Sequence, residues 1–134
     1  MHDVACRLAA PVDAPTLSAL AIQVFLGTYA EDGVSPSVAH EAHELLSPAA
    51  FDAALADPAH TIVLAEREGR LLGFAQLAFP SRHALVPHEN AAELVRLYVQ
   101  EQSTGRGIGR ALLGQAEGEA DVERTQRRRI GGAS

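Results

Sequence analysis

A strand-like run, a glycine-rich turn and an amphipathic stretch follow one another in the last third of the chain, and this succession constrains the fold most. The run from Glu93 to Val99 alternates as a half-buried strand does, and from Ile108 apolar residues recur at helical spacing. Glycines occupy positions 105, 107 and 109 between them. This arrangement predicts an anion site, because a first helical turn has unpaired N–H groups and glycine lets a phosphate approach the backbone.

The glycine turn fits two linked phosphates better than it fits either of two common nucleotide motifs. Arg106 and Arg110 can add charge-assisted contacts at its rim. The nucleoside-triphosphate loop requires a lysine, and the sequence contains none. The dinucleotide fingerprint requires Gly-x-Gly-x-x-Gly, whereas the spacing here is Gly-x-Gly-x-Gly. The alternative is that the glycines only form a flexible loop before a helix.

Upstream of this turn, the sequence predicts a strand, three helices and a hairpin. A short apolar run over 4–9 predicts the strand, and helical spacing predicts a helix over 14–29. Ser35-Pro36 and Ser47-Pro48 each place a capping residue before a proline, which predicts two short helices. Two apolar runs, 61–65 and 71–79, predict a hairpin. We expect residues 1–123 to form one domain and residues 124–134 to form a basic, irregular tail.

The composition favours a single folded domain and argues against several classes of partner. With 134 residues, 47% of them hydrophobic, the chain can bury one core. Residues 1–123 carry a net charge of −10, and four arginines after them bring the total to −6. Such acidity disfavours nucleic acid, whose binding depends on neutralising phosphates. The sequence also predicts no membrane span and no secretory signal, and its single cysteine suits a reducing compartment, so we predict a cytoplasmic location.

The glycine turn resembles motif A of the GNAT family of N-acetyltransferases. That motif reads Gln or Arg, two residues, Gly, one residue, then Gly or Ala, and here it falls on residues 104–109, with Thr104 departing at the first position. The resemblance covers about residues 2–121. It implies the acyl-CoA N-acyltransferase fold, an α/β fold with a mixed, mostly antiparallel sheet flanked by helices. Residues 25–30 and 96–99 are similar to the branch that acetylates polyamines.

The resemblance implies acetyl coenzyme A as the co-substrate and no metal. The pyrophosphate would lie on the glycine turn, and the pantetheine arm would pair like an added strand with exposed backbone of the preceding strand. One strand N–H group would polarise the thioester carbonyl. The expected cofactor-binding residues are Leu97, Tyr98, Val99, Thr104, Gly105, Arg106, Gly107, Ile108, Gly109 and Arg110.

In the mechanism that the resemblance implies, the amine attacks the thioester directly and a base takes a proton from its ammonium form. Glu93 is the candidate base, because alternation would place it on the same face as Val95 and Leu97. The alternative is a solvated acid at the start of a strand. The expected acceptor is a primary amine of a small, polyamine-like molecule.

The tyrosine that usually serves this family as general acid lies in a later stretch, which neither Tyr29 nor Tyr98 matches. We therefore expect a chain that lacks the C-terminal strands and helix of the fold, with an exposed edge that a homodimer or larger assembly completes. The alternative function is a catalytically impaired domain that binds coenzyme A or only self-associates.

Other polar residues suggest weaker hypotheses. His40 and His43 are three residues apart, whereas a zinc protease motif needs histidines four apart, so a solvated helix face is the simpler interpretation. The residues that could border a substrate cleft are Glu31, Asp32, His83 and His88.

Overall fold

A computed structural model describes residues 4–79, 92–105 and 107–132 and, from 123 onward, the backbone alone. Four strands form one sheet in the order β1-β2-β3-β4, and each described pair is antiparallel. The strands are β1 (Ala5–Leu8), β2 (His60–Arg67), β3 (Arg70–Ala78) and β4 (Glu93–Val99). The helices are α1 (Ala14–Tyr29), α2 (Pro36–Leu45), α3 (Pro48–Ala56) and α4 (Ile108–Gly132).

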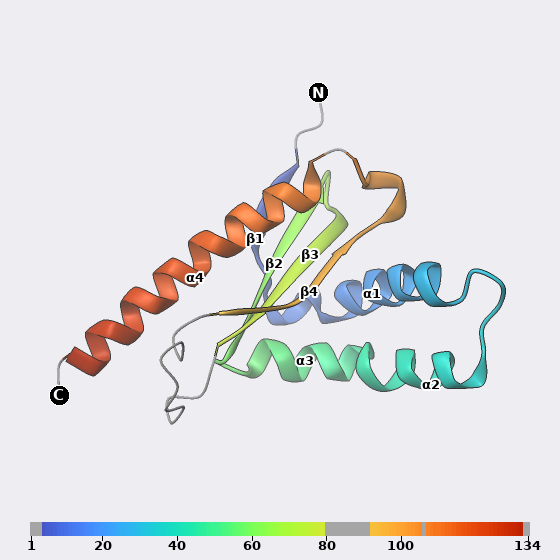
Figure 1. The fold of residues 1–134 in the computed structure, drawn as a ribbon, viewed down its shortest axis with the longest axis horizontal. Helices are drawn as coiled ribbons and strands as arrows, with labels where there is room; N and C mark the ends of the chain where they lie inside the picture. Colours follow the sequence, from blue (N-terminus) through green and yellow to red (C-terminus); the bar gives the residue numbers. More distant parts are fainter. Residues whose placement is uncertain (1–3, 80–91, 106, 133–134) are drawn as a thin grey trace.

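Helices cover both faces of the sheet, as Figure 1 shows, with α4 on one face and α1 and α3 on the other. Alternation along β2 and β3 separates the two cores. Val63, Ala75 and Leu77 pack with α4, whereas Leu64 and Phe74 pack with α1 and α3. The expectation of a mostly antiparallel sheet flanked by helices is therefore confirmed.

The predicted helix starts on the α1–α3 side are confirmed by their caps. The Ser35 hydroxyl accepts a hydrogen bond from the Val38 N–H at 3.3 Å, and the Ser47 hydroxyl accepts one from the Ala50 N–H at 3.1 Å. Each bond satisfies one of the N–H groups that a first helical turn leaves without a partner. Because these contacts span three residues, the sequence alone could reveal them.

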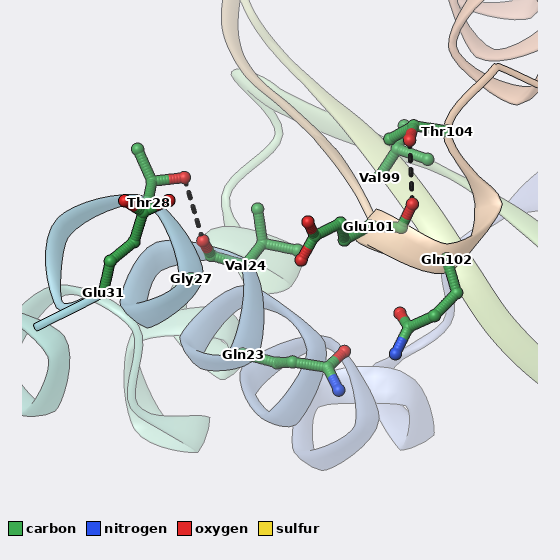
Figure 2. A pocket seen from close by; sticks show the side chains of 9 residues that line it. All are labelled: Gln23, Val24, Gly27, Thr28, Glu31, Val99, Glu101, Gln102 and Thr104. Atoms are coloured by element: carbon green, nitrogen blue, oxygen red, sulfur yellow. Dashed lines mark hydrogen bonds between the residues drawn. The ribbon is translucent and has the colours of Figure 1, made fainter.

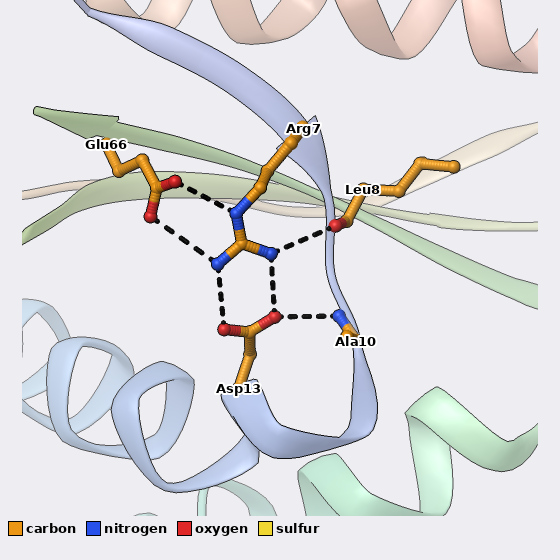
Figure 3. Close-up of polar contacts among 5 residues, drawn as sticks. All are labelled: Arg7, Leu8, Ala10, Asp13 and Glu66. Atoms are coloured by element: carbon orange, nitrogen blue, oxygen red, sulfur yellow. Dashed lines mark hydrogen bonds and ion pairs between the residues drawn. The ribbon is translucent and has the colours of Figure 1, made fainter. Parts of the chain in front are cut away.

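Arg7 joins β1 to the start of α1 and to β2 (Figure 3). Its guanidinium donates to both carboxylate oxygens of Asp13 at 2.9 Å and to Glu66 Oε1 at 2.9 Å. The hydrogen bonds from Arg7 hold the pKa of the Asp13 carboxyl below its usual value. Asp13 also accepts a hydrogen bond from the Ala10 N–H at 2.7 Å. The Asp13 carboxylate therefore holds both Arg7 of the edge strand β1 and the turn that leads into α1.

A β-bulge in β4 changes which side chains face which core. Gln76 of β3 faces Arg96, but its neighbour Leu77 faces Leu94, so Val95 is an extra residue in β4. Leu94 consequently lies on the α4 face, where it lines a groove with residues of that helix. Simple alternation in the sequence could not show this insertion.

The C-terminal segment differs from the sequence-based expectation. Residues 124–132, predicted to be irregular, continue α4 as far as Gly132. The reason is intrinsic propensity: between 119 and 130 the chain has no glycine or proline and is rich in Glu, Gln and Arg, which favour helix even without an apolar stripe. The division of the chain at residue 123 remains a prediction.

Candidate functional site

The hydrogen-bond pattern between β3 and β4 determines which backbone groups of β4 face away from the sheet. The Gln100 N–H donates to the Leu72 carbonyl at 2.8 Å. In an antiparallel pair such bonds recur at every second residue, so Tyr98 and Arg96 also direct their backbone groups toward β3. Leu97 and Val99 then direct their N–H and C=O groups toward the opposite edge. Among the described strands β4 pairs only with β3, so this edge is available to a ligand.

The glycine turn after β4 requires glycine at two positions. Gly105 has φ 80° and Gly107 has φ 78°, a left-handed conformation that other residues rarely adopt. A Cβ atom added at either position would meet no atom within 4 Å, so the space beside the turn is open. Arg106, predicted to contact the phosphates, lies outside the described residues.

The first turn of α4 presents backbone donors next to this open space. The first intrahelical bond runs from the Ala111 N–H to the Gly107 carbonyl at 2.9 Å. The N–H groups of Ile108, Gly109 and Arg110 belong to the first turn of α4, whose donors have no acceptor within the helix. The helix start therefore offers several donors and the positive end of the helix dipole to an anion.

Packing fixes the position of that helix start relative to β4. Ile108 and Leu112 are buried against the sheet in the α4 core. Gly73 lies beneath them on β3, where an added Cβ would be 2.7 Å from the Tyr98 carbonyl oxygen and 3.3 Å from Leu112 Cδ1. The end of β4 and the first turns of α4 can therefore approach β3 only because residue 73 has no side chain.

Glu93 lies on the face of the sheet opposite to the one predicted. It is paired with Ala78, and the bulge at Val95 puts it on the α1–α3 face rather than beside Leu97 on the α4 face. The prediction of a shared face was wrong because it assumed unbroken alternation. Glu93 remains exposed at the start of β4.

A buried amide links β2, β3 and β4 on the same face as Glu93. Gln76 is 3% exposed, and its Oε1 accepts a hydrogen bond from the Arg96 guanidinium at 3.0 Å. Its Nε2 lies 3.3 Å from His60 Nδ1. This chain of contacts holds the Arg96 side chain immediately after the bulge, next to the position of Glu93.

A cavity of about 390 Å³ lies between α1 and the segment that follows β4 (Figure 2). Figure 2 shows the Glu101 side chain extending toward α1 from the short 3-10 helix Glu101–Ser103. The cavity reaches both β4 and the start of the glycine turn. Its lining residues are Gln23, Val24, Gly27, Thr28, Glu31, Val99, Glu101, Gln102 and Thr104.

Internal hydrogen bonds leave this cavity rich in acceptors. The Thr28 hydroxyl donates to the Val24 carbonyl at 3.1 Å, and the Thr104 hydroxyl donates to the Glu101 carbonyl at 2.8 Å. With both hydroxyl protons engaged, these oxygens face the cavity as acceptors. The carboxylates of Glu31 and Glu101 add two anionic acceptors, and the described lining contains no lysine, arginine or histidine.

The structure brings together some predicted residues and separates others. Glu31 lines the cavity, as expected for a cleft residue, but sequence reasoning missed Gln23, Thr28 and Glu101. They approach one another only through the packing of α1 beside β4, which leaves no local signal. Tyr98 packs on Phe74 with ring centroids 5.4 Å apart, and Tyr29 is 65% exposed at the end of α1. His83 and His88 lie outside the described residues.

The described part of the chain offers neither a metal centre nor a membrane span. No group of three or more His, Cys, Asp or Glu side chains there could hold a metal ion. None of the described helices is both long enough and apolar enough to cross a membrane.

Three solved structures that share this fold are named as acetyltransferases. The PaiA N-acetyltransferase of Thermoplasma acidophilum, in complex with coenzyme A, aligns with TM-score 0.76 and 23% identity over 90% of this chain and 74% of its own. The ribosomal-protein-alanine N-acetyltransferase of Brucella melitensis aligns with TM-score 0.65 and 20% identity over 91% and 74%. An aminoglycoside acetyltransferase from an uncultured soil metagenomic sample, in complex with sisomicin, gives 0.62 and 16% over 90% and 71%.

The sequence itself carries the family pattern. No protein of curated function matches it closely enough to count as a relative. The pattern of the Acetyltransferase (GNAT) family, however, matches residues 27–130, which include most of the cavity lining, β4, the glycine turn and almost all of α4. The chain therefore belongs to the GNAT family of acetyltransferases.

Proposed function

We propose that this protein transfers the acetyl group of acetyl coenzyme A to a primary amine of a small, cationic molecule. The observation that carries the proposal is the continuity of three features: the outward backbone of β4, the open glycine turn and the donor-rich start of α4. Together they form one track of backbone donors long enough for an extended ligand that ends in phosphates.

The residues along this track fit coenzyme A. The open space at Gly105 and Gly107, and the N–H groups of the first α4 turn, suit the pyrophosphate. The outward groups of Leu97 and Val99 suit the amide groups of the pantetheine arm, which would pair as a strand does. Arg110 is exposed beside the turn and can add a charge-assisted contact. Acetyl coenzyme A supplies an activated thioester, so no nucleophile of the protein is needed.

Glu93 is the proposed base for the amine. An ammonium group must lose a proton before its nitrogen can attack, and a carboxylate can accept that proton directly or through water. The bulge places Glu93 on the α1–α3 face at the start of β4, whereas the cavity meets β4 at Val99, its last residue, so a proton from an amine in the cavity would have to reach Glu93 through water. Acetyl coenzyme A would then approach β4 from its outer edge, and the amine would approach from the α1–α3 face of the sheet.

The cavity supports a cationic acceptor. Its unengaged groups are mostly hydrogen-bond acceptors, and two of them are carboxylates, so an ammonium group would find both charge and lone pairs there. We expect Glu31→Gln or Glu101→Gln to raise the KM for 1,4-diaminobutane about tenfold, the scale of a lost hydrogen bond to a charged group. The KM for 1-aminobutane should change less, because it lacks the second ammonium group.

The second candidate function is a domain that binds coenzyme A without transferring the acetyl group. The positions of the two tyrosines favour it, because Tyr98 packs on Phe74 and Tyr29 lies at the exposed end of α1. Neither is an evident proton donor for a departing thiolate. Release of free coenzyme A thiol in the presence of an amine separates the two functions.

Calorimetric titration with acetyl coenzyme A tests the proposal. The natural sequence should bind with a dissociation constant between about 1 μM and 1 mM. Gly107→Glu should abolish binding, because the new carboxylate would repel the pyrophosphate. Gly118→Glu is the matched control: it places the same charge on the same helix, at an exposed position with open space. Equal binding by both variants, or none by the folded natural sequence, would contradict the proposal.

A further inference from the structure

A largely apolar groove of about 310 Å³ lies between the start of β4 and α4, whereas the cavity described above meets β4 at its end. Leu94 is 44% exposed and Leu113 is 37% exposed at its opening. Two carboxylates, Glu117 and Asp121, are the charged groups of its lining. The apolar lining residues are Leu77, Ala92, Leu94, Leu113, Ala116 and Ala120.

The charges along α4 change sign abruptly beyond this groove. Four acids occupy positions 117, 119, 121 and 123, and four arginines follow at 124, 127, 128 and 129 with no further acid. The helix is continuous across the change, and in Figure 1 its last turns extend past the strands of the sheet. Such an extension gains little from the core, and short helical segments without tertiary packing are marginal in water.

Two of the acidic positions and two of the arginine positions lie on the same side of the helix. Position 124 follows Glu117 by seven residues, and position 128 follows Asp121 by seven, which is two turns in each case. These positions therefore fall on the side of α4 that borders the groove. We define positions 117, 121, 124 and 128, with Leu113, Ala116 and Ala120, as the α4 strip.

We propose that the α4 strip is the interface of a two-fold symmetric dimer in which α4 of one copy packs antiparallel to α4 of the other. An antiparallel arrangement places position 117 opposite position 128 of the second copy, and position 121 opposite position 124. Every acidic position of the strip then lies opposite an arginine position, twice over because of the two-fold axis. In this register, whose two-fold axis passes between positions 122 and 123, Ala120, Ala116 and Leu113 lie opposite positions 125, 129 and 132 of the second copy.

A second copy fits this surface better than an unrelated partner because the strip is complementary to itself. A two-fold interface requires the same patch on both subunits, so its own charges must match when the patch is reversed. An acidic half followed by a basic half on one helix meets that requirement. At β4 the groove reaches Ala92 and Leu94, so this interface leaves the outward backbone of Leu97 and Val99 to coenzyme A, whereas a dimer that completed the sheet would compete for it. The proposal is independent of acetyl transfer.

Charge reversal on the two halves tests the arrangement. The acid-reversed variant is Glu117→Arg with Asp121→Arg, and the base-reversed variant is Arg124→Glu with Arg128→Glu. Each strip then carries one sign of charge, so each variant should self-associate about tenfold more weakly or worse, and a 1:1 mixture should restore the dimer. Glu41→Arg with Glu44→Arg on α2 changes the net charge as much as the acid-reversed variant does and should leave the dimer intact.

Sedimentation velocity measures these outcomes, and circular dichroism confirms that each variant is folded. The natural sequence should sediment as a dimer and should dissociate as salt rises from about 0.05 M to 0.5 M, because exposed ion pairs are screened. Recovery of the dimer only in the mixture supports the proposal. A monomeric natural sequence, or a dimer that both reversed variants retain, would overturn it.

Discussion

A Cβ atom on Gly73 would lie 2.7 Å from the backbone carbonyl oxygen of Tyr98, closer than such atoms approach in proteins. β3, β4 and α4 meet at this point, so the residue with no side chain determines how closely the cofactor-binding strand and helix pack.

Gly73→Ala should therefore destabilise the fold. The new methyl group must displace backbone of β4 and the Leu112 side chain, and overpacking of this kind costs about 1–3 kcal/mol. Urea unfolding followed by circular dichroism measures the loss. Gly114→Ala, at an open position of α4, is the control and should be neutral or slightly stabilising. Equal stability of the two variants would show that the close approach is not required.

Gly105→Ala should impair both stability and cofactor binding. Its φ of 80° costs a residue with a Cβ about 1–2 kcal/mol. Gly69 in the β2–β3 turn has φ 75°, so Gly69→Ala carries a similar strain far from the glycine turn. Unfolding should show similar losses for both variants, whereas calorimetry should show weaker coenzyme A binding for Gly105→Ala alone. Weaker binding by both would assign the effect to stability.

Glu93→Gln should slow turnover without weakening acetyl coenzyme A binding. Loss of a positioned base reduces kcat about 10²–10⁴-fold. Activity should recover partly at high pH, where more of the free amine is already deprotonated. Steady-state kinetics with 1,4-diaminobutane measures this, and Glu44→Gln on the exposed face of α2 is the control. An unchanged kcat would remove Glu93 from the mechanism.

The Arg7 contacts predict a pH dependence of stability. Because Arg7 lowers the pKa of folded Asp13, the stabilisation is complete above the unfolded pKa of about 3.9 and is lost as the pH falls below it toward the folded pKa. Arg7→Met should lower the free energy of unfolding at pH 7 by at most about 1 kcal/mol, since the Arg7 side chain is 42% exposed. It should also flatten the decline in stability below pH 4. An unaltered acid profile would contradict this role.

The sequence predicted those features that depend on neighbouring residues. The Ser35 and Ser47 caps and the hairpin turn are local, and all were expected from residue type. The family resemblance also pointed to the outward backbone of β4. These features account for most of the fold and for the cofactor side of the candidate site.

Features that depend on contacts between distant segments were not predictable. The bulge at Val95 reversed the face assigned to Glu93, and an insertion in a strand leaves no trace in periodicity. The cavity joins Gln23 to Glu101 through the packing of α1 beside the end of β4. The C-terminal turns of α4 carry no apolar stripe, so periodicity gives no sign of a helix there, and intrinsic helix propensity alone favours it.

Binding of coenzyme A by the outer edge of β4 and the start of α4 can be followed at the amide N–H groups of these two segments. Nuclear magnetic resonance of the ¹⁵N-labelled protein, titrated with coenzyme A, reports on each amide separately. We predict the largest shifts at Leu97, Val99, Gly107 and Gly109, and smaller ones at Arg96 and Tyr98, whose N–H groups face β3. Shifts confined to other parts of the chain, or none at saturating coenzyme A, would show that these segments do not bind it.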